Sequence, residues 1–136
     1  MTPADYFPDL NEWPENWMGV EGDLEIGCRL LALFIPFIQH QINRGMAGKT
    51  IKTHGQNLGI LGSEIIKRLN QNEEENRKLS PRELILHYVD DKGGPLVSHW
   101  DVNDITGYRY YLAYDSTCRN FLQFITGKAA KVRQRR

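Results

Sequence analysis

The clearest pattern of apolar positions lies between Lys49 and Asn70, where the residues that favour burial recur at steps of three or four. This spacing places them on one side of an α-helix. The stripe consists of Ile51, His54, Leu58, Leu61, Ile65 and Leu69. The opposite side carries Lys49, Lys52, Gln56, Ser63 and Lys67. We therefore predict a helix over residues 49–70 that buries one face and presents a basic, polar face to water.

Three glycines, Gly55, Gly59 and Gly62, lie inside this predicted helix. Each costs about 0.5–1 kcal/mol relative to alanine in a helix interior. Their separations of four and three residues indicate a shallow groove along the helix. We expect another helix backbone to approach closely in this groove.

A helix over residues 23–44 is predicted before the glycine-containing one. Asp23 is its expected N-cap, and Pro36 is expected to kink the helix or to end its first half. Its apolar stripe consists of Cys28, Leu30, Leu31, Phe34, Phe37, Ile38 and Ile42. Only a short connection separates it from the helix over 49–70, so the two should be antiparallel neighbours.

Two further helices are predicted in the second half of the chain. The first spans residues 80–90 and begins with a capping box, in which Ser80 is the N-cap and Glu83 occupies the third position. The second spans about residues 103–126, with a break indicated by the cap-like residues 115–117. The side expected to be buried carries Ile105, Tyr108, Leu112, Cys118, Phe121, Leu122 and Ile125.

Residues 1–22, here called the arm, combine helix-breaking prolines and glycines with large apolar side chains. A disordered segment rarely carries two tryptophans, here Trp13 and Trp17. We predict an irregular arm that packs on the bundle and buries its aromatic side chains, with a short helical turn between the tryptophans. The alternative is that these aromatic side chains are exposed and bind a partner.

These elements predict an all-α fold, a single compact bundle of four main helices over residues 23–44, 49–70, 80–90 and 103–126. The helical domain spans residues 23–127, the arm precedes it, and a basic tail over 128–136 is expected to be flexible. A chain of 136 residues fits one such domain.

Charge is distributed in blocks, although the 17 basic and 17 acidic residues give a net charge of zero. Residues 1–25 hold seven acidic residues and no basic one, whereas residues 26–72 hold six basic residues and one acidic one. Residues 73–104 are again acidic, and residues 105–136 hold seven basic residues and one acidic one. Such asymmetry bears on partners and surfaces, not on the fold.

The sequence contains no pattern typical of a catalytic, cofactor or metal site. No phosphate-binding loop, dinucleotide fingerprint or hydrolase motif is present, and the four histidines are scattered. His54 lies on the apolar stripe and is expected to be a hydrogen-bonded core residue. Cys28 and Cys118 are expected to be buried free thiols. We therefore predict no enzyme, no cofactor, no metal and no small-molecule substrate.

Nothing in the sequence predicts a membrane segment. The longest apolar run, Leu30 to Ile35, is far too short to cross a bilayer. The opening residues MTPADYFPDL are acidic and lack the apolar core of a signal peptide. We therefore expect a cytoplasmic location.

Four segments in order resemble a known family. They are LLALFIPFIQHQINRG, the pattern K-T-x-K-T-x-x-x-x-L-x-x-L, SPRELILHYV and STCRNFLQFI. Over residues 28–127 this order is similar to the N-terminal, SAM-like core-binding domain of tyrosine recombinases and phage integrases. The resemblance implies a four-helix unit that clamps duplex DNA, chiefly through its second and fourth helices.

The resemblance also implies roles for particular residues. Thr50 matches a recurrent threonine, and Lys49, Lys52 and Thr53 fall where side chains contact the DNA backbone. In the last helix the matching residues are Ser116, Arg119, Phe121, Phe124 and Ile125, and Arg119 would be the basic contact. The family commonly has two adjacent basic residues where Ala113 and Tyr114 stand, and its catalytic residues have no counterpart here.

Two functions remain open from the sequence. One is a non-catalytic interaction or structural module on this scaffold, which binds a protein partner or a second copy of itself. The other is a stand-alone module that binds duplex DNA through Lys49, Thr50, Lys52, Thr53, Lys67, Arg109 and Arg119. A third idea joins the two, in which the acidic arm covers the basic face and blocks it.

Overall fold

The structure, a computed structural model, describes residues 1–127, so the predicted basic tail lies outside the described residues. The helices in chain order are α1 (Pro3–Tyr6), η1 (Leu10–Glu12), α2 (Trp13–Trp17), α3 (Asp23–Asn43), α4 (Gly48–Gln71), η2 (Glu74–Lys78), α5 (Pro81–Tyr88) and α6 (Ile105–Thr126). Residues 1–127 contain no strand, only an isolated bridge between Asp90 and Gly93. The predicted all-α bundle with four main helices is confirmed.

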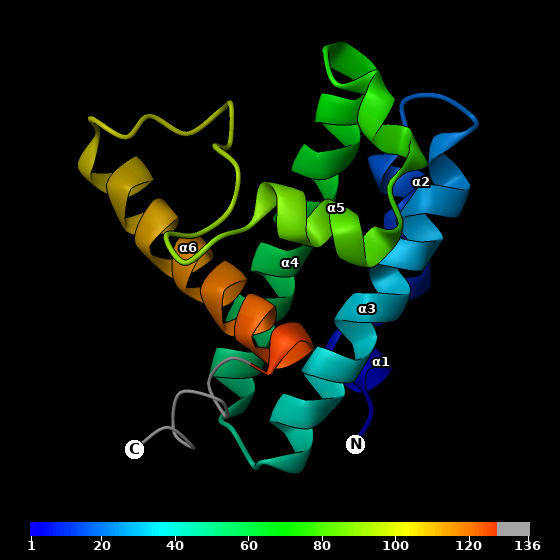
Figure 1. The fold of residues 1–136 in the computed structure, drawn as a ribbon. Helices are drawn as coiled ribbons and strands as arrows, with labels where there is room; N and C mark the ends of the chain where they lie inside the picture. Colours follow the sequence, from blue (N-terminus) through cyan, green and yellow to red (C-terminus); the bar gives the residue numbers. More distant parts are fainter. Residues whose placement is uncertain (128–136) are drawn as a thin grey trace.

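α4 packs against two of the other three main helices. The chain turns back between α3 and α4 at Gly45, whose φ of 72° is the left-handed conformation that ends many helices. α4 contacts α3 along one side and α6 along another, and α5 packs on α3. In Figure 1, α6 crosses α4, and its N-terminal half (yellow) extends away from the other helices.

α5 begins at its predicted capping box, and both ends of α6 carry capping residues. The Ser80 side chain accepts a hydrogen bond from the backbone N–H of Glu83, and the Glu83 carboxylate accepts one from the N–H of Ser80. The N-cap of α6 is Asp104, whose side chain accepts from the N–H groups of Thr106 and Gly107. α6 ends at Gly127, which has a φ of 69°.

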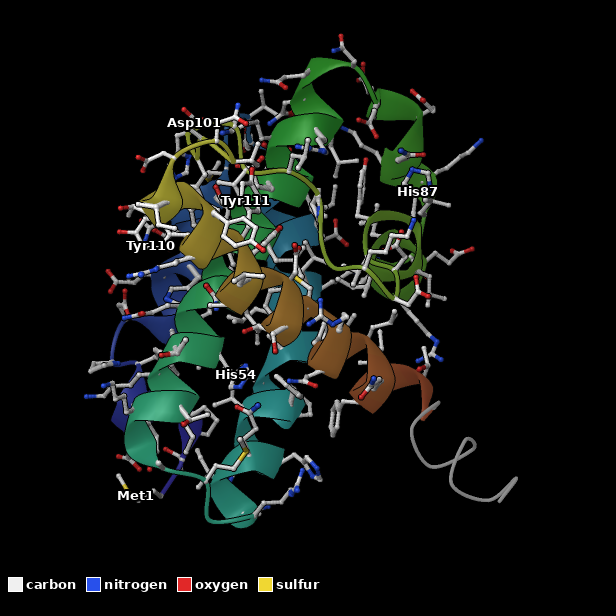
Figure 2. The ribbon with its side chains drawn as sticks, turned by 90° about the vertical axis from the view of Figure 1, so that its left-hand side faces the viewer. Met1, His54, His87, Asp101, Tyr110 and Tyr111 are labelled. Atoms are coloured by element: carbon white, nitrogen blue, oxygen red, sulfur yellow. The ribbon has the colours of Figure 1, made fainter. Side chains whose placement is uncertain are left out.

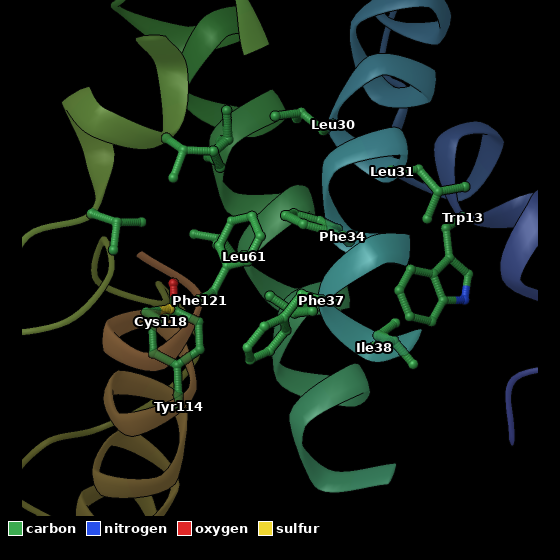
Figure 3. Packing of buried hydrophobic residues seen from close by; sticks show 14 of the residues in the cluster. Trp13, Leu30, Leu31, Phe34, Phe37, Ile38, Leu61, Tyr114, Cys118 and Phe121 are labelled. Atoms are coloured by element: carbon green, nitrogen blue, oxygen red, sulfur yellow. The ribbon is translucent and has the colours of Figure 1, made fainter. Parts of the chain in front are cut away.

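The core follows the predicted stripe of α4. Its apolar members are all buried, and they belong to one core cluster with buried residues of α3, α5 and α6. Aromatic rings connect α3 with α6, because Phe121 lies 5.2 Å from Phe34 and 5.6 Å from Phe37 between ring centroids. Figure 3 shows these three rings beside Leu61 of α4. α4 therefore lies at the centre of the bundle, with its apolar stripe buried among residues of the other helices.

Of the two effects expected at Pro36, an end of the helix does not occur, because α3 continues through this residue to Asn43. Proline removes the hydrogen bond to the carbonyl of Ala32, but both residues lie on the exposed side, where water can bind that carbonyl. Cys28 is exposed, not buried, whereas Cys118 is a buried free thiol as predicted. Cys28 lies one residue after the position, Gly27, that α3 presents to the arm.

The arm is more regular than predicted, because it contains α1, η1 and α2, including the helical turn between Trp13 and Trp17. It lies against α3 and α4. Phe7, Leu10 and Trp13 are buried, and Trp17 is partly buried. Figure 3 shows Trp13 beside α3, close to Leu31 and Ile38. The arm is therefore part of the same hydrophobic core as the bundle.

The glycines of α4 receive aromatic rings of the arm, not a helix backbone as predicted. A Cβ atom at Gly55 would overlap the ring of Phe7, and one at Gly62 would overlap the ring of Trp17. At Gly59 the nearest atoms belong to Trp13, 3.9 Å away. The groove exists because α4 lacks side chains where the large rings of the arm must fit.

Asp23 anchors the end of the arm and does not act as the predicted N-cap. It is the first residue of α3, and its fully buried carboxylate accepts hydrogen bonds from the N–H groups of Gly19 and Val20. The same carboxylate accepts from the Asn70 side chain at 2.7 Å and pairs with Arg77 at 2.8 Å. One buried charge thus joins the arm, α4 and η2.

Candidate functional site

The predicted DNA contacts at the start of α4 lie on its solvent side. Lys49, Lys52 and Thr53 are exposed, and Thr50 is partly exposed. The Thr53 hydroxyl donates to the carbonyl of Lys49 at 3.0 Å, so it is already engaged with its own helix. Within residues 1–127, neither Lys49 nor Lys52 forms an ion pair.

Lys67 does not belong to a free basic face. Its ammonium group pairs with Glu64 at 3.3 Å and donates to the Ser98 hydroxyl at 3.0 Å. Glu64 is almost fully buried, and Arg68 also pairs with it, at 3.1 Å, and donates to the carbonyl of Leu96. These contacts attach the segment before α6 to α4, so Lys67 has a structural role.

The two arginines of α6 differ in their surroundings. Arg109 is exposed on the first half of the helix. Arg119 is partly buried and donates to the carbonyl of Lys92 at 3.3 Å. The guanidinium group of Arg119 therefore supports the turn before α6. Of these two arginines, Arg109 alone presents its charge to solvent without such a contact in the described residues.

The first half of α6 has its apolar residues turned to solvent, which contradicts the predicted buried side. Ile105 is 63% exposed, Tyr108 51% and Leu112 54%. The buried residues there are Gly107, Tyr111 and Tyr114. The helix also continues through residues 115–117 without the predicted break. We call Ile105, Tyr108, Arg109 and Leu112 the α6 stripe.

Hydrogen bonds and ring contacts hold the first half of α6, which carries the α6 stripe, in place. The Tyr111 hydroxyl donates to the carbonyl of Val97 and accepts from its N–H group, both at 2.8 Å. The Tyr114 hydroxyl donates to the carbonyl of Pro95. Trp100 packs against both tyrosine rings and against Tyr110. Figure 2 shows Tyr110 and Tyr111 on this half of α6, near Asp101. The exposed residues therefore lie on ordered helix, not on a frayed end.

A groove of about 700 Å³ lies between the arm and the solvent side of α4. Its arm side is formed by Phe7, Asp9, Trp13, Asn16 and Trp17, and its α4 side by Gln56, Gly59, Ile60 and Ser63. Asp9 is the only charged residue among them. We call this space the arm groove; its surface is aromatic with one carboxylate. Sequence reasoning missed it, because it depends on how the arm packs.

Within residues 1–127, the carboxylates of the acidic arm do not pair with the lysines at the start of α4. These carboxylates, Asp5, Asp9, Glu12, Glu15 and Glu21, are exposed, and none forms an ion pair with Lys49 or Lys52 within residues 1–127. The arm instead reaches the glycine side of α4 with its rings.

A polar cluster joins α4 to α6 inside the core. His54 projects from α4 toward α6 (Figure 2), and its Nδ1 lies 2.9 Å from the Thr117 hydroxyl. Asn57 donates to the same oxygen at 3.0 Å, and Thr117 donates its single hydrogen to the carbonyl of Ala113. Because that hydrogen is used, His54 must donate from Nδ1, which fixes its neutral tautomer. His54 is therefore hydrogen-bonded as predicted, although its side chain is only partly buried.

This cluster makes stability depend on pH. Burial lowers the pKa of His54 below its ordinary value of 6.5. As pH falls, His54 therefore binds its proton at a higher pH in the unfolded chain than in the folded protein. The contribution of neutral His54 to the free energy of unfolding is present above pH 6.5 and is lost below it. We expect the free energy of unfolding, measured with urea, to fall between pH 7.5 and 5.5. The variant His54→Gln should show a smaller fall, and an equal fall in both proteins would contradict the assignment.

A thiol, metal ligands and membrane-spanning helices are the remaining features to assess in the described residues. Burial raises the pKa of the Cys118 thiol, which keeps it protonated and inert as a nucleophile. No group of three or more metal-binding side chains occurs within residues 1–127. Over the same residues, every helix is too short or too polar to cross a membrane.

Comparisons with protein-family models, with curated proteins and with solved structures found no match. Three surfaces in the described part of the chain are candidates for a function: the lysines at the start of α4, the α6 stripe and the arm groove.

Proposed function

We propose that the protein is a non-catalytic interaction module, on a scaffold like a recombinase core-binding domain, which binds a protein partner through the α6 stripe. The observation that supports this most directly is where exposed apolar side chains gather. Ten large apolar side chains are exposed in the described part of the chain, and five of them lie between residues 102 and 112. Scattered exposed residues need no explanation, but a contiguous patch marks an interaction surface.

The spacing of the patch suits a helical contact. Ile105, Tyr108 and Leu112 occupy positions i, i+3 and i+7 of one helix face, the pattern by which a helix inserts side chains into a partner's groove. Tyrosine and arginine are enriched in the energetic centres of interfaces, and Tyr108 and Arg109 supply both. Because Tyr111 and Tyr114 hold the helix in place, little ordering entropy is lost on binding.

Site-specific photo-cross-linking tests this function. With the photoreactive residue p-benzoylphenylalanine at position 108, irradiated cells should yield a discrete cross-linked product. The same residue at position 87, an exposed site on α5, serves as the control. The product should disappear when Ile105→Asp and Leu112→Asp are added. Equal yields at both positions, or no product at position 108, would overturn the proposal.

A second candidate function, binding of duplex DNA, is favoured by Lys49 and Lys52. Both lie exposed within the first two turns of α4, and neither is neutralised by a carboxylate within residues 1–127. Lysines in such a position neutralise phosphates and release counterions, which gives affinity that falls steeply with salt. Lys67 and Arg119 are engaged within the protein and contribute less to this candidate.

Fluorescence anisotropy with a labelled generic duplex tests the second candidate. At low salt the wild type should bind, and Lys49→Ala and Lys52→Ala should each lower the slope of log affinity against log salt by about one. Lys78→Ala, an exposed lysine of η2, is the matched control and should change the slope less. Absence of binding at the lowest salt concentration would rule this candidate out.

A further inference from the structure

We propose that the partner of the α6 stripe is a second copy of this chain, and that the stripe of one copy inserts into the arm groove of the other. This inference rests on the proposed function, because it names the partner of the same surface. It also gives the arm groove an occupant.

The two surfaces are complementary in charge. Asp9 is the only ionisable residue of the arm groove, and the neighbouring arm residues Glu12 and Glu15 are exposed carboxylates. The α6 stripe carries Arg109 and no acid. Asp104, next to Ile105, caps α6 through the N–H groups of Thr106 and Gly107, and Asp115, further along the helix, is partly buried and accepts from the N–H of Gly94. Arg109 can therefore approach Asp9 while the apolar side chains enter the groove.

The two surfaces are also complementary in shape and polarity. The groove volume of about 700 Å³ lies within the roughly 300–1,000 Å³ typical of pockets that enclose a few large groups. Trp13, Trp17 and Ile60 give it apolar walls, and Asn16, Gln56 and Ser63 offer polar atoms at its edges. The first half of α6 extends from the body (Figure 1), so the side chains at positions 105, 108 and 112 can enter such a space.

The stripe cannot fill the groove of its own chain. α6 touches α4 through Thr117, which bonds to His54 and Asn57. Leu112 lies five residues before Thr117, about 140° from it around the helix, so the stripe faces away from this contact. The interface must therefore form between copies. Because its two sides differ, it is a head-to-tail interface, which either closes into a ring or continues as a chain.

Two half-defective variants test this geometry. The stripe variant carries Ile105→Asp and Leu112→Asp, and the groove variant carries Asp9→Arg and Gln56→Arg; all four residues are exposed, so the fold should persist. Circular dichroism and thermal melting verify this. In sedimentation velocity at about 100 μM, a concentration suited to a weak, micromolar complex, the wild type should exceed the mass of one 15.8 kDa chain. Each variant alone should sediment as a monomer.

An equimolar mixture of the two variants decides the matter. The stripe variant retains its groove and the groove variant retains its stripe, so the mixture should form a 1:1 dimer with one intact interface. A monomeric wild type overturns the inference. So does a mixture that stays monomeric while the wild type assembles. A groove variant that still assembles by itself also overturns the inference, since that result indicates symmetric pairing of α6. If position 108 cross-links only to a different protein and the wild type is monomeric, the proposed function stands and this inference fails.

Discussion

Replacing Asp23 by alanine is expected to lower the free energy of unfolding by about 3 kcal/mol, the largest effect of any single substitution considered for this protein. The change removes the acceptor for the N–H groups of Gly19 and Val20 and leaves Arg77 without its carboxylate partner. Removing one member of a buried pair costs about 3–5 kcal/mol. We expect the lower end because the Arg77 side chain is 23% exposed and can turn toward water. Urea denaturation monitored by tryptophan fluorescence measures the change.

The matched control is the exposed ion pair between Glu25 and Arg29, one turn further along α3. Both of these side chains are more than half exposed, so Glu25→Ala should change the stability by no more than about 0.5 kcal/mol. If Asp23→Ala and Glu25→Ala had similar effects, the buried carboxylate would not be the anchor of the arm.

The same carboxylate should appear in the pH dependence of stability. Burial alone would raise the pKa of Asp23, but hydrogen bonds from Asn70, Val20, Gly19 and Arg77 outweigh it and lower the pKa to about 2. Its ordinary value is 3.8. The stabilisation is therefore complete above pH 3.8 and is lost as pH falls toward 2, a total of about 2 kcal/mol. Asp23→Asn should lack this component, and an unchanged acid dependence would contradict the assignment.

The elements that could be predicted from the sequence are those determined by local patterns. The stripe of α4 is buried because its period matches a helix, and the ends at Ser80 and Gly127 follow from side-chain capping and from a left-handed glycine. These features depend on residues within a few positions of one another. Long-range packing does not need to be known to place them.

α6 shows why a periodic pattern can be insufficient. Its first half carries two apolar stripes at helical spacing, one through Ile105, Tyr108 and Leu112, and one through Gly107, Tyr111, Tyr114 and Cys118. Both satisfy the pattern, and the first was predicted to be the buried one. Trp100 and the hydroxyl contact between Tyr111 and Val97 determine that the second is buried. The α6 stripe was therefore predicted as core and is instead the candidate interface.

Some of the candidate DNA contacts are free at the surface and others are engaged within the protein, for a similar reason. Lys49 and Lys52 lie where helix periodicity places them, at the surface. Lys67 lies on the same line, but Glu64 stands three residues before it and binds it. The spacing of three is a signal for such a pair that the sequence already contains. The burial of Glu64 and its pairing with Arg68 depend on the segment between α5 and α6. They could therefore not be predicted from neighbouring residues in the sequence.

The glycines of α4 should respond to alanine in opposite directions. Alanine favours a helix over glycine by about 0.5–1 kcal/mol, which is gained at all three positions. At Gly59 a Cβ atom would lie at ordinary contact distance, 3.9 Å from Trp13, so Gly59→Ala should stabilise the protein by this amount. At Gly55 and Gly62 a Cβ atom would overlap buried rings, and overpacking of this kind costs about 1–3 kcal/mol.

Gly55→Ala and Gly62→Ala are therefore expected to lower the melting temperature, whereas Gly59→Ala raises it. Phe7 and Trp17 must move away from α4 to accommodate the added methyl groups, and this movement separates the arm from the bundle. Tryptophan emission should shift to longer wavelength in Gly62→Ala, because Trp17 becomes more exposed. If all three substitutions stabilised the protein equally, helix propensity alone would determine the outcome, and the arm would not be bound through the space that the glycines leave. The two directions thus measure how firmly the arm, and with it one wall of the arm groove, is held on α4.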